Sequence, residues 1–264
     1  MPPAFRAICL TILSSFAAAW LAGPAAAQPI EVRIGAAHFP PYTVRPEQGT
    51  ETGLLAALAG ALNAAQADYH FVLVPTSIPR RFADLQQGRT DMAIFENPEW
   101  GWRDVPHIAV DMGLEDAEVF VARRASGRDQ HYFDDWRGKR LALFNGYHYA
   151  FAGFNADPRF LHAAFKATTT YSHDSNLFMV QRGRADIALV TRSYVSDFLA
   201  RHPREASELL VSDRIDQTYR HYALLRLDAP IGREVFAGLL RQLRQRGDLQ
   251  RIFTPYRIAV RVPD

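Results

Sequence analysis

A ten-residue segment that occurs twice limits the fold of this chain more than any other feature of its sequence. The first copy is Leu85–Ile94 and the second is Val180–Leu189, so that Gly88 and Gly183 stand 95 residues apart. Both copies contain a glycine, an arginine directly after it, and an aspartate that opens an apolar run. Such a glycine is typical of a left-handed helix cap, and such a run is typical of a buried strand. The repeat therefore predicts two related α/β lobes.

Hydrophobic periodicity predicts the same order of elements around each copy of the repeat. Each half reads as strand, helix, strand, helix, strand, and helical crossovers of this length imply parallel strands covered on both faces. The first half has strands at 31–37, 70–75 and 91–95 and helices at 53–65 and 79–87. The second half has strands at 140–145, 168–172 and 186–190 and helices at 160–167 and 174–182.

Two extended segments, 117–123 and 220–227, separate the halves, and an amphipathic helix at 231–246 follows the second segment. A chain that leaves one lobe, builds another and returns forms a hinge of two strands. The expected division is 28–119 for the first part of lobe 1, 120–222 for lobe 2 with its hinge segments, and 223–264 for the return to lobe 1. Ligands of open α/β sheets bind beyond the carboxyl ends of the strands, so two facing lobes predict a cleft that closes about the hinge.

The N-terminus has the pattern of a secretory signal peptide. Arg6 precedes an apolar stretch at 7–23, and three alanines before Gln28 fit a cleavage site, so residues 1–27 are expected to be removed. Cys9 lies within this stretch and is the one cysteine of the sequence, so the mature chain would contain neither a disulfide nor a cysteine metal site. These features predict a periplasmic protein.

Charge and motifs exclude several classes of function. The formal net charge of +2 falls to about +1 once Arg6 is removed, which does not indicate a nucleic-acid binder. The sequence has no G-x-S-x-G elbow, no H-E-x-x-H, no P-loop and no G-x-G-x-x-G motif. No histidine pair has the spacing of a metal-binding helix, so we expect neither a metal nor an organic cofactor.

The order and spacing of several short segments resemble the extracellular solute-binding protein family 3, the type II periplasmic binding proteins that include receptors for polar amino acids. Besides the repeat, the segments are Phe39–Tyr42, Gly53–Leu55, Phe133–Lys139 and Gly247–Tyr256. The resemblance implies an α/β fold of two Rossmann-like lobes joined by a two-strand hinge. It also implies a monomeric, non-catalytic periplasmic protein that captures a small polar or anionic solute for the membrane permease of an ABC transporter.

The resemblance also implies two ligand contacts. In amino-acid receptors of the family an arginine twelve residues after the first repeat aspartate binds the ligand carboxylate, which points to Arg103. The family's ammonium-binding aspartate lies five residues after the second repeat aspartate, where this chain has Thr191. A threonine cannot balance a buried ammonium charge. Either Glu96 replaces the aspartate, or the ligand is a carboxylate or aromatic compound without a cationic amine.

Aromatic residues follow the predicted strands, where the cleft should lie, and could stack on a ring or an apolar ligand body. Tyr42 and Trp100 are the best candidates, and Gly146 would offer its backbone N–H to an anion. The full set of aromatic candidates is Phe39, Tyr42, Trp100, Trp102, Tyr147 and Tyr149.

Two other functions remain open at this point. Glu96 and Glu99 could act as acid and base of a periplasmic lyase on a cyclic carboxylate, because a few relatives of this fold are dehydratases. The chain could also be the ligand-sensing subunit of a signalling receptor, which the sequence does not separate from a transport protein.

Overall fold

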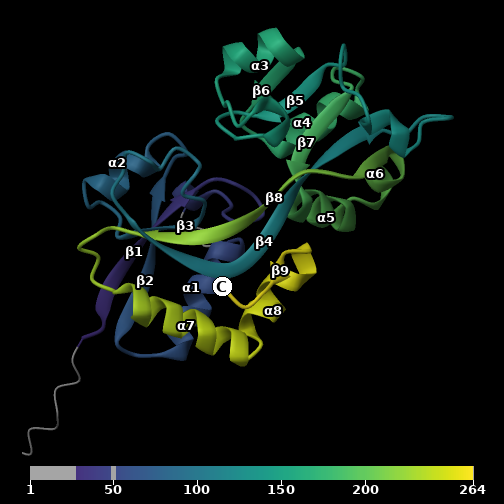
Figure 1. Ribbon diagram of the computed structural model, residues 1–264. Helices are drawn as coiled ribbons and strands as arrows, with labels where there is room; N and C mark the ends of the chain where they lie inside the picture. The colour runs from purple at the N-terminus through teal and green to yellow at the C-terminus, as the bar shows by residue number, and fades with distance from the viewer. Residues whose placement is uncertain (1–27, 49–51, 264) are drawn as a thin grey trace, which may run out of the picture.

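The computed structural model describes residues 28–48 and 52–263, and it shows two lobes joined by a pair of long strands (Figure 1). The predicted signal peptide, residues 1–27 with Cys9, lies outside the described residues. A search of the described residues finds no helix of the length and apolar character that a membrane crossing requires.

One nine-stranded sheet runs through both lobes in the order β2-β1-β3-β8-β4-β7-β5-β6, with the short strand β9 (Ala259–Val260) beside β4. The long strands β4 (Ile108–Arg123) and β8 (Leu209–Leu225) are antiparallel neighbours at its centre. Each belongs to lobe 1 at one end and to lobe 2 at the other, so together they form the two-strand hinge (Figure 1).

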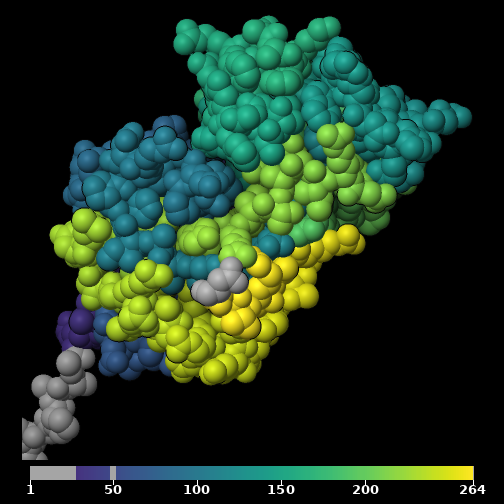
Figure 2. Space-filling model, viewed as in Figure 1, coloured from purple at the N-terminus to yellow at the C-terminus, as the bar shows by residue number. Residues whose placement is uncertain are grey.

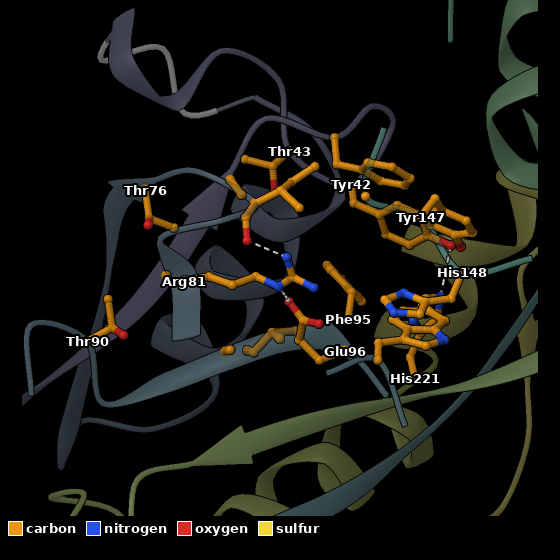
Figure 3. A pocket seen from close by; sticks show the side chains of 18 of the residues that line it. Tyr42, Thr43, Thr76, Arg81, Thr90, Phe95, Glu96, Tyr147, His148 and His221 are labelled. Carbon is orange, nitrogen blue, oxygen red and sulfur yellow. Dashed lines mark hydrogen bonds and ion pairs between the residues drawn. The ribbon is translucent and has the colours of Figure 1, made fainter. Parts of the chain in front are cut away.

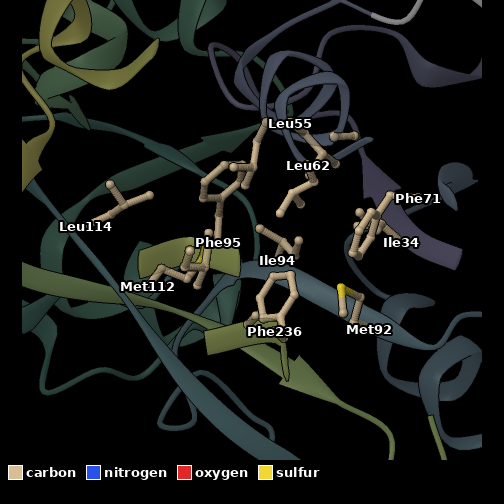
Figure 4. Close-up of a cluster of buried hydrophobic side chains, with 14 of the residues drawn as sticks. Ile34, Leu55, Leu62, Phe71, Met92, Ile94, Phe95, Met112, Leu114 and Phe236 are labelled. Carbon is tan, nitrogen blue, oxygen red and sulfur yellow. The ribbon is translucent and has the colours of Figure 1, made fainter. Parts of the chain in front are cut away.

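Lobe 1 contains three strands besides its part of the hinge. The strand β1 pairs in parallel with β2 and β3, and β3 pairs antiparallel with β8. The elements of lobe 1 are β1 (Ile30–Ala37), β2 (Tyr69–Thr76), β3 (Met92–Glu96), α1 (Leu54–Ala65), α2 (Arg81–Gln86), α7 (Arg233–Gln245) and α8 (Asp248–Phe253). Side chains of α1 and α7 meet those of β1 to β4 in one apolar core (Figure 4).

Lobe 2 repeats this arrangement. The strand β5 pairs in parallel with β6 and β7, and β7 pairs antiparallel with β4. Its elements are β5 (Leu141–Phe144), β6 (Ala167–Thr170), β7 (Ile187–Thr191), α3 (Pro158–Phe165), α4 (His173–Gln181), α5 (Arg192–Arg201) and α6 (Pro203–Glu208). Two apolar clusters fill this lobe, one containing residues of α4 and α5 and the other a residue of α3. Short 3-10 helices occur at Pro46–Gln48, Gln130–Phe133, Ala150–Ala152 and Thr254–Tyr256.

The repeated aspartate has the same role in each lobe. The carboxylate of Asp91 accepts hydrogen bonds from the backbone N–H of Arg33 at 2.9 Å and from Nε and Nη2 of its guanidinium at 2.9 and 2.8 Å. Asp186 accepts the backbone N–H of Arg140 at 2.8 Å and its guanidinium at 2.9–3.0 Å. Each aspartate therefore fastens the start of its own strand to the central parallel strand beside it.

The repeat glycines cap their helices as the sequence predicts. Gly88 and Gly183 have φ of 71° and 67°, and each donates its N–H to the carbonyl three residues before it. The predicted α/β elements are present with ends shifted by about one to three residues, as is usual for such boundaries.

Two features of the fold were not predicted. The hinge segments at 117–123 and 220–227 are only the ends of strands of 16 and 17 residues. The helices α5, α6 and α8 were not predicted either; α6 and α8 have six residues each, too few for periodicity to show.

Candidate functional site

A cavity of about 90 Å³ lies between the lobes. Lobe 1 contributes the loops after β1 and β3 and the start of α2, lobe 2 contributes Asn145–His148 after β5, and the hinge contributes residues of β8 (Figure 3). One buried water needs about 10–15 Å³ of such space, so the cavity has room for a small solute. The surfaces of the two lobes are in contact on the face shown in Figure 2.

The loop after β1 is fixed by the first turn of α1. Leu54 and Leu55 donate their N–H groups to the carbonyls of Pro41 and Tyr42 at 3.1 and 2.8 Å. Gly53 has φ of 102°, and a Cβ there would lie 2.7 Å from the carbonyl oxygen of Tyr42. The Phe39–Tyr42 and Gly53–Leu55 segments therefore act together, because the glycine allows the helix to hold Tyr42 against the cavity.

Arg81, the first residue of α2, reaches into the cavity toward Glu96 (Figure 3). Its Nε lies 2.7 Å from Oε1 of Glu96, its Nη1 donates to the carbonyl of Ile78, and its side chain is 12 % exposed. An arginine carries five N–H donors, and within residues 28–48 and 52–263 these two contacts are its hydrogen bonds and ion pairs. The remaining donors need water or a ligand, because a buried donor without an acceptor is costly.

Glu96 is buried, and each of its two carboxylate oxygens has a partner. Its second oxygen, Oε2, accepts the indole N–H of Trp102 at 2.8 Å, while Oε1 faces Arg81. Burial raises the pKa of Glu96, and the positive charge of Arg81 and the Trp102 hydrogen bond oppose this rise. Glu96 therefore holds Arg81 in place rather than offering a free carboxylate to a ligand.

Five aromatic rings that line the cavity form a closed circuit of contacts, here called the aromatic circuit. The distances between neighbouring ring centroids around the circuit are 5.6 Å for Phe39–Tyr147, 5.7 Å for Tyr147–Trp100, 6.4 Å for Trp100–His221, 5.0 Å for His221–Tyr42 and 6.1 Å for Tyr42–Phe39. Tyr147 belongs to lobe 2, whereas Phe39, Tyr42 and Trp100 belong to lobe 1, so the circuit joins the lobes.

Two fully buried carboxyl groups of the hinge strand β4 lie behind the aromatic circuit. Asp116 accepts the hydroxyl of Tyr42 at 2.5 Å, and Glu118 lies 3.5 Å from the hydroxyl of Tyr219. Burial raises the pKa of Asp116, and burial together with the charge of Asp116 raises the pKa of Glu118 far above its usual range. Neither carboxyl lines the cavity directly.

Two histidines of the cavity wall are kept neutral by burial. Burial lowers the pKa of His221 to about 3, and burial followed by the charge of Arg81 lowers the pKa of His148. His221 Nε2 lies 2.9 Å from the hydroxyl of Tyr42. The wall opposite Arg81 is therefore aromatic and uncharged near neutral pH.

Six of the eight residues that the sequence predicted for the site line this cavity, and they come from both lobes. They are Phe39, Tyr42, Glu96, Trp100, Gly146 and Tyr147. Trp102 and Tyr149 are buried in the apolar clusters of their lobes instead.

The other two predicted residues lie outside the cavity. Arg103 is exposed, because Trp102 turns inward to Glu96 and the next residue points to solvent. Thr191 is buried at the N-cap of α5, where its hydroxyl accepts the N–H of Tyr194 at 3.1 Å. The expectation that these two side chains face the cleft is therefore corrected by their positions.

The sequence analysis missed Arg81, Asp116, Glu118 and His221 as members or neighbours of the site. A usable signal existed for the two acids, which stand two residues apart in the strand β4 and therefore point to one face of the sheet. No comparable signal marks Arg81. Within the described residues, no group of three His, Cys, Asp or Glu side chains is placed to hold a metal ion.

Comparison with known proteins shows the fold. No family model matches the chain, and no curated protein is similar to it in sequence. Many solved structures do match. A mutant of ArgBP from T. maritima has a TM-score of 0.63 at 18% identity, over 86% of this chain and 94% of that one. The GluR0 ligand-binding core from Nostoc punctiforme, in complex with (L)-glutamate, has a TM-score of 0.64 at 14% identity, over 86% and 99%.

A third similar structure is the ancestral amino acid-binding protein AncCDT-1, described as a precursor of cyclohexadienyl dehydratase. Its TM-score is 0.64 at 18% identity, over 86% of this chain and 94% of that one. The chain thus has the two-lobed α/β fold of the type II periplasmic binding proteins, as the resemblance in its sequence implies. Identities this low define the fold and leave the ligand to be argued from the cavity.

Proposed function

We propose that the chain is a solute-binding protein that captures a small anionic solute between its lobes and delivers it to the membrane permease of an ABC transporter. The observation that carries this proposal is Arg81, a nearly buried arginine with unused donors at a cavity closed by both lobes. A guanidinium suits this role because it pairs with both oxygens of a carboxylate. The structures named above, among them binding proteins for amino acids, support the class of function.

Arg81 takes the role in this proposal that the sequence resemblance gave to Arg103. Glu96 and the Ile78 carbonyl fix its guanidinium from two sides, which reduces the entropy lost when a ligand binds. The aromatic circuit then contacts the body of the solute. Secretion through the N-terminal signal and a monomeric state remain part of the proposal.

The geometry favours capture over the lyase alternative. Both oxygens of Glu96 are occupied by Arg81 and Trp102, so this carboxyl is poorly placed to move a proton on a ligand. Glu99 is exposed and does not line the cavity. A general acid or base has to come within hydrogen-bond reach of the proton that it transfers.

The proposal is tested by calorimetric titration of the mature chain, from Gln28 onward, with short aliphatic acids, dicarboxylates, aromatic acids and amino acids. We expect at least one carboxylate to bind, and Arg81→Met to weaken its binding by about 30-fold or more, since truncating one partner of a buried charge pair costs about 2–5 kcal/mol. Arg103→Met is the matched control and should change affinity by less than about twofold, because that side chain is exposed.

Thermal unfolding of both variants shows whether each remains folded. Undiminished binding by Arg81→Met would contradict the proposal, as would an equal loss in both folded variants. Absence of binding by every acid in the series would count against an anionic solute.

A further inference from the structure

The charged side chains of the cavity wall form an ion pair with each other. Nε of Arg81 lies 2.7 Å from Oε1 of Glu96, so the pair has no net charge. The other side chains of the wall, within the described residues, are uncharged or are histidines kept neutral by burial. An anion bound at Arg81 therefore needs a further positive charge nearby, because a buried charge without a partner is costly.

His148 is the residue of lobe 2 that can carry this charge. It lines the cavity in the segment Asn145–His148 after β5, and its backbone carbonyl accepts a hydrogen bond from Nε2 of Gln217 on the hinge strand β8. In the described part of the chain its imidazole has no hydrogen bond, ion pair or ring contact. The imidazole of His221, in contrast, lies 2.9 Å from the hydroxyl of Tyr42.

Two observations bring His148 and Arg81 together at one place in the cavity, which they approach from opposite lobes (Figure 3). The charge of Arg81 acts on the imidazole, because it adds to the effect of burial in lowering the pKa of His148. A Cβ at Gly146 would lie 3.8 Å from Cγ2 of Ile78, and the carbonyl of Ile78 accepts a hydrogen bond from Arg81. The loop of lobe 2 thus meets lobe 1 beside the arginine.

We propose that His148 binds the carboxylate of the ligand from lobe 2 while Arg81 binds it from lobe 1, and that the imidazole takes up a proton as the ligand enters. The inference rests on the proposed function and adds to it a second binding residue and a proton. Once His148 is protonated, two positive charges face the one negative charge of Glu96, and a single carboxylate restores neutrality. The cleft therefore selects a small monocarboxylate, because a second acidic group would have no positive partner.

The direction of the pH dependence follows from these charges. In the free protein, burial and the charge of Arg81 lower the pKa of His148, so the imidazole is neutral at pH 7. A bound carboxylate cancels the charge of Arg81 and attracts the proton, so this pKa rises in the complex. Affinity for a monocarboxylate should therefore increase as pH falls from 8 to 6.

One other ionisable side chain of the cavity wall could take up the proton in this range. Burial lowers the pKa of His221 to about 3 and raises the pKa of each tyrosine of the wall far above its usual range. Glu96 is the exception, because burial raises its pKa against the opposing effects of Arg81 and Trp102. The ionisable groups that line the cavity with His148 are Tyr42, Arg81, Glu96, Tyr147, Tyr219 and His221.

Calorimetric titration of the mature chain tests the uptake of a proton. The probes are acetate, butanoate, benzoate and phenylacetate, which stay ionised between pH 6 and 8. Each is measured at pH 7 in bis-tris and in Tris buffer, whose heats of ionisation differ, so that the difference in binding enthalpy gives the number of protons taken up. We expect an uptake approaching one proton and a gain in affinity of about fivefold or more from pH 8 to pH 6. Succinate, which adds a second carboxylate to the chain of butanoate, should bind more weakly than butanoate.

Variants assign the proton to His148. His148→Gln should abolish the uptake and weaken binding at pH 6 by about tenfold, the usual cost of losing a hydrogen bond to a charged group. His131→Gln is the matched control, because this histidine is exposed in lobe 2 and its pKa is raised by the hydrogen bond to Asp134, so it titrates near neutral pH away from the cavity. It should change neither the uptake nor the affinity.

Thermal unfolding shows whether His148→Gln remains folded. NMR titration of the imidazole protons in the unchanged chain provides a readout without any variant, and the pKa of one histidine should rise when a monocarboxylate is bound.

The inference is overturned, while the proposed function stands, if folded His148→Gln takes up as many protons as the unchanged chain, which would assign the proton to Glu96. Equal affinity at pH 6 and pH 8, tighter binding of succinate than of butanoate, or a histidine spectrum that does not respond to a bound monocarboxylate would also overturn it. If no carboxylate binds at all, the proposed function fails with it.

Discussion

The two lobes share a framework but divide the work of the site unequally. Both have the same strand order, the same glycine cap and the same pairing of an aspartate with an arginine at the start of the central strands. Lobe 1 supplies both charged side chains of the cavity, Arg81 and Glu96, whereas lobe 2 supplies only Asn145–His148. The repeat thus specifies a scaffold, and the residues beyond the strand ends specify what it binds.

The pairing of the repeat aspartate with arginine is more extensive and more buried in lobe 1 than in lobe 2. The carboxylate of Asp91 is buried and bonds two arginines, Arg33 at 2.8–2.9 Å and Arg226 at 2.9 Å. The carboxylate of Asp186 bonds one arginine, Arg140, and is 31 % exposed. Burial alone would raise the pKa of Asp91, but the hydrogen bonds from the two arginines outweigh it and lower that pKa.

The largest predicted effect tests this asymmetry. Asp91→Ala should lower the free energy of unfolding by about 3 kcal/mol, because it leaves two arginines next to a buried void. Asp186→Ala should cost only about 1 kcal/mol, since water can solvate Arg140 in its place. Denaturant unfolding of both variants measures the difference, and equal losses would show that the two pairings are equivalent despite their different burial.

Much of the fold could be predicted because the repeat reflects interactions between residues that are close together in the sequence. A glycine in a left-handed cap and an aspartate at a strand start leave a pattern within ten residues, and Gly88 and Gly183 have the predicted conformation. The partners Arg33 and Arg140 left no such pattern, because their contacts with Asp91 and Asp186 join residues 58 and 46 positions apart. Sequence periodicity does not report contacts at that separation.

The candidate site could be predicted only in part, because only the residues that follow strand ends have positions that the sequence pattern indicates. Phe39, Tyr42 and Trp100 could be placed because residues after parallel strands gather at one edge of the sheet. Arg103 could not be placed correctly by counting from Asp91, because the turn after Glu96 decides which side chains point inward. Arg81 reaches the cavity from the start of a helix, a position that the rule of strand ends does not cover.

The next prediction compares two buried histidines, His221 at the lobe 1 end of the hinge strand β8 and His173 at the start of α4 in lobe 2. Burial lowers the pKa of His221 to about 3, and burial together with the charge of His38 lowers the pKa of His173 to about 3. In the unfolded chain a histidine titrates near 6.5. Below pH 6.5 the unfolded state therefore takes up protons that the folded state does not, and stability falls as pH drops toward 3.

Each histidine should contribute about 2 kcal/mol to the loss of stability between pH 7 and pH 5. His173→Phe and His221→Phe should flatten the profile of unfolding free energy against pH by similar amounts. His70→Asn is the control, because this side chain is exposed on β2 and its imidazole meets water in both states. A flattening by only one of the two variants would show that the lobes protect their histidines unequally.

The smallest predicted effect concerns two residues at equivalent positions of the repeat, each five residues after its aspartate. Glu96 holds Arg81 in the cavity, whereas Thr191 caps α5 by accepting the N–H of Tyr194. Thr191→Ala should lower the free energy of unfolding by about 1 kcal/mol, the usual cost of losing an N-cap, and leave ligand affinity unchanged. Glu96→Gln should instead weaken carboxylate binding, because Arg81 loses the anion that orients it. Denaturant unfolding and calorimetric titration of the two variants separate these roles. A loss of affinity in Thr191→Ala would return this position to the binding site, where the sequence resemblance had placed it, and would mean that the equivalence of the lobes extends beyond the strands into the cleft.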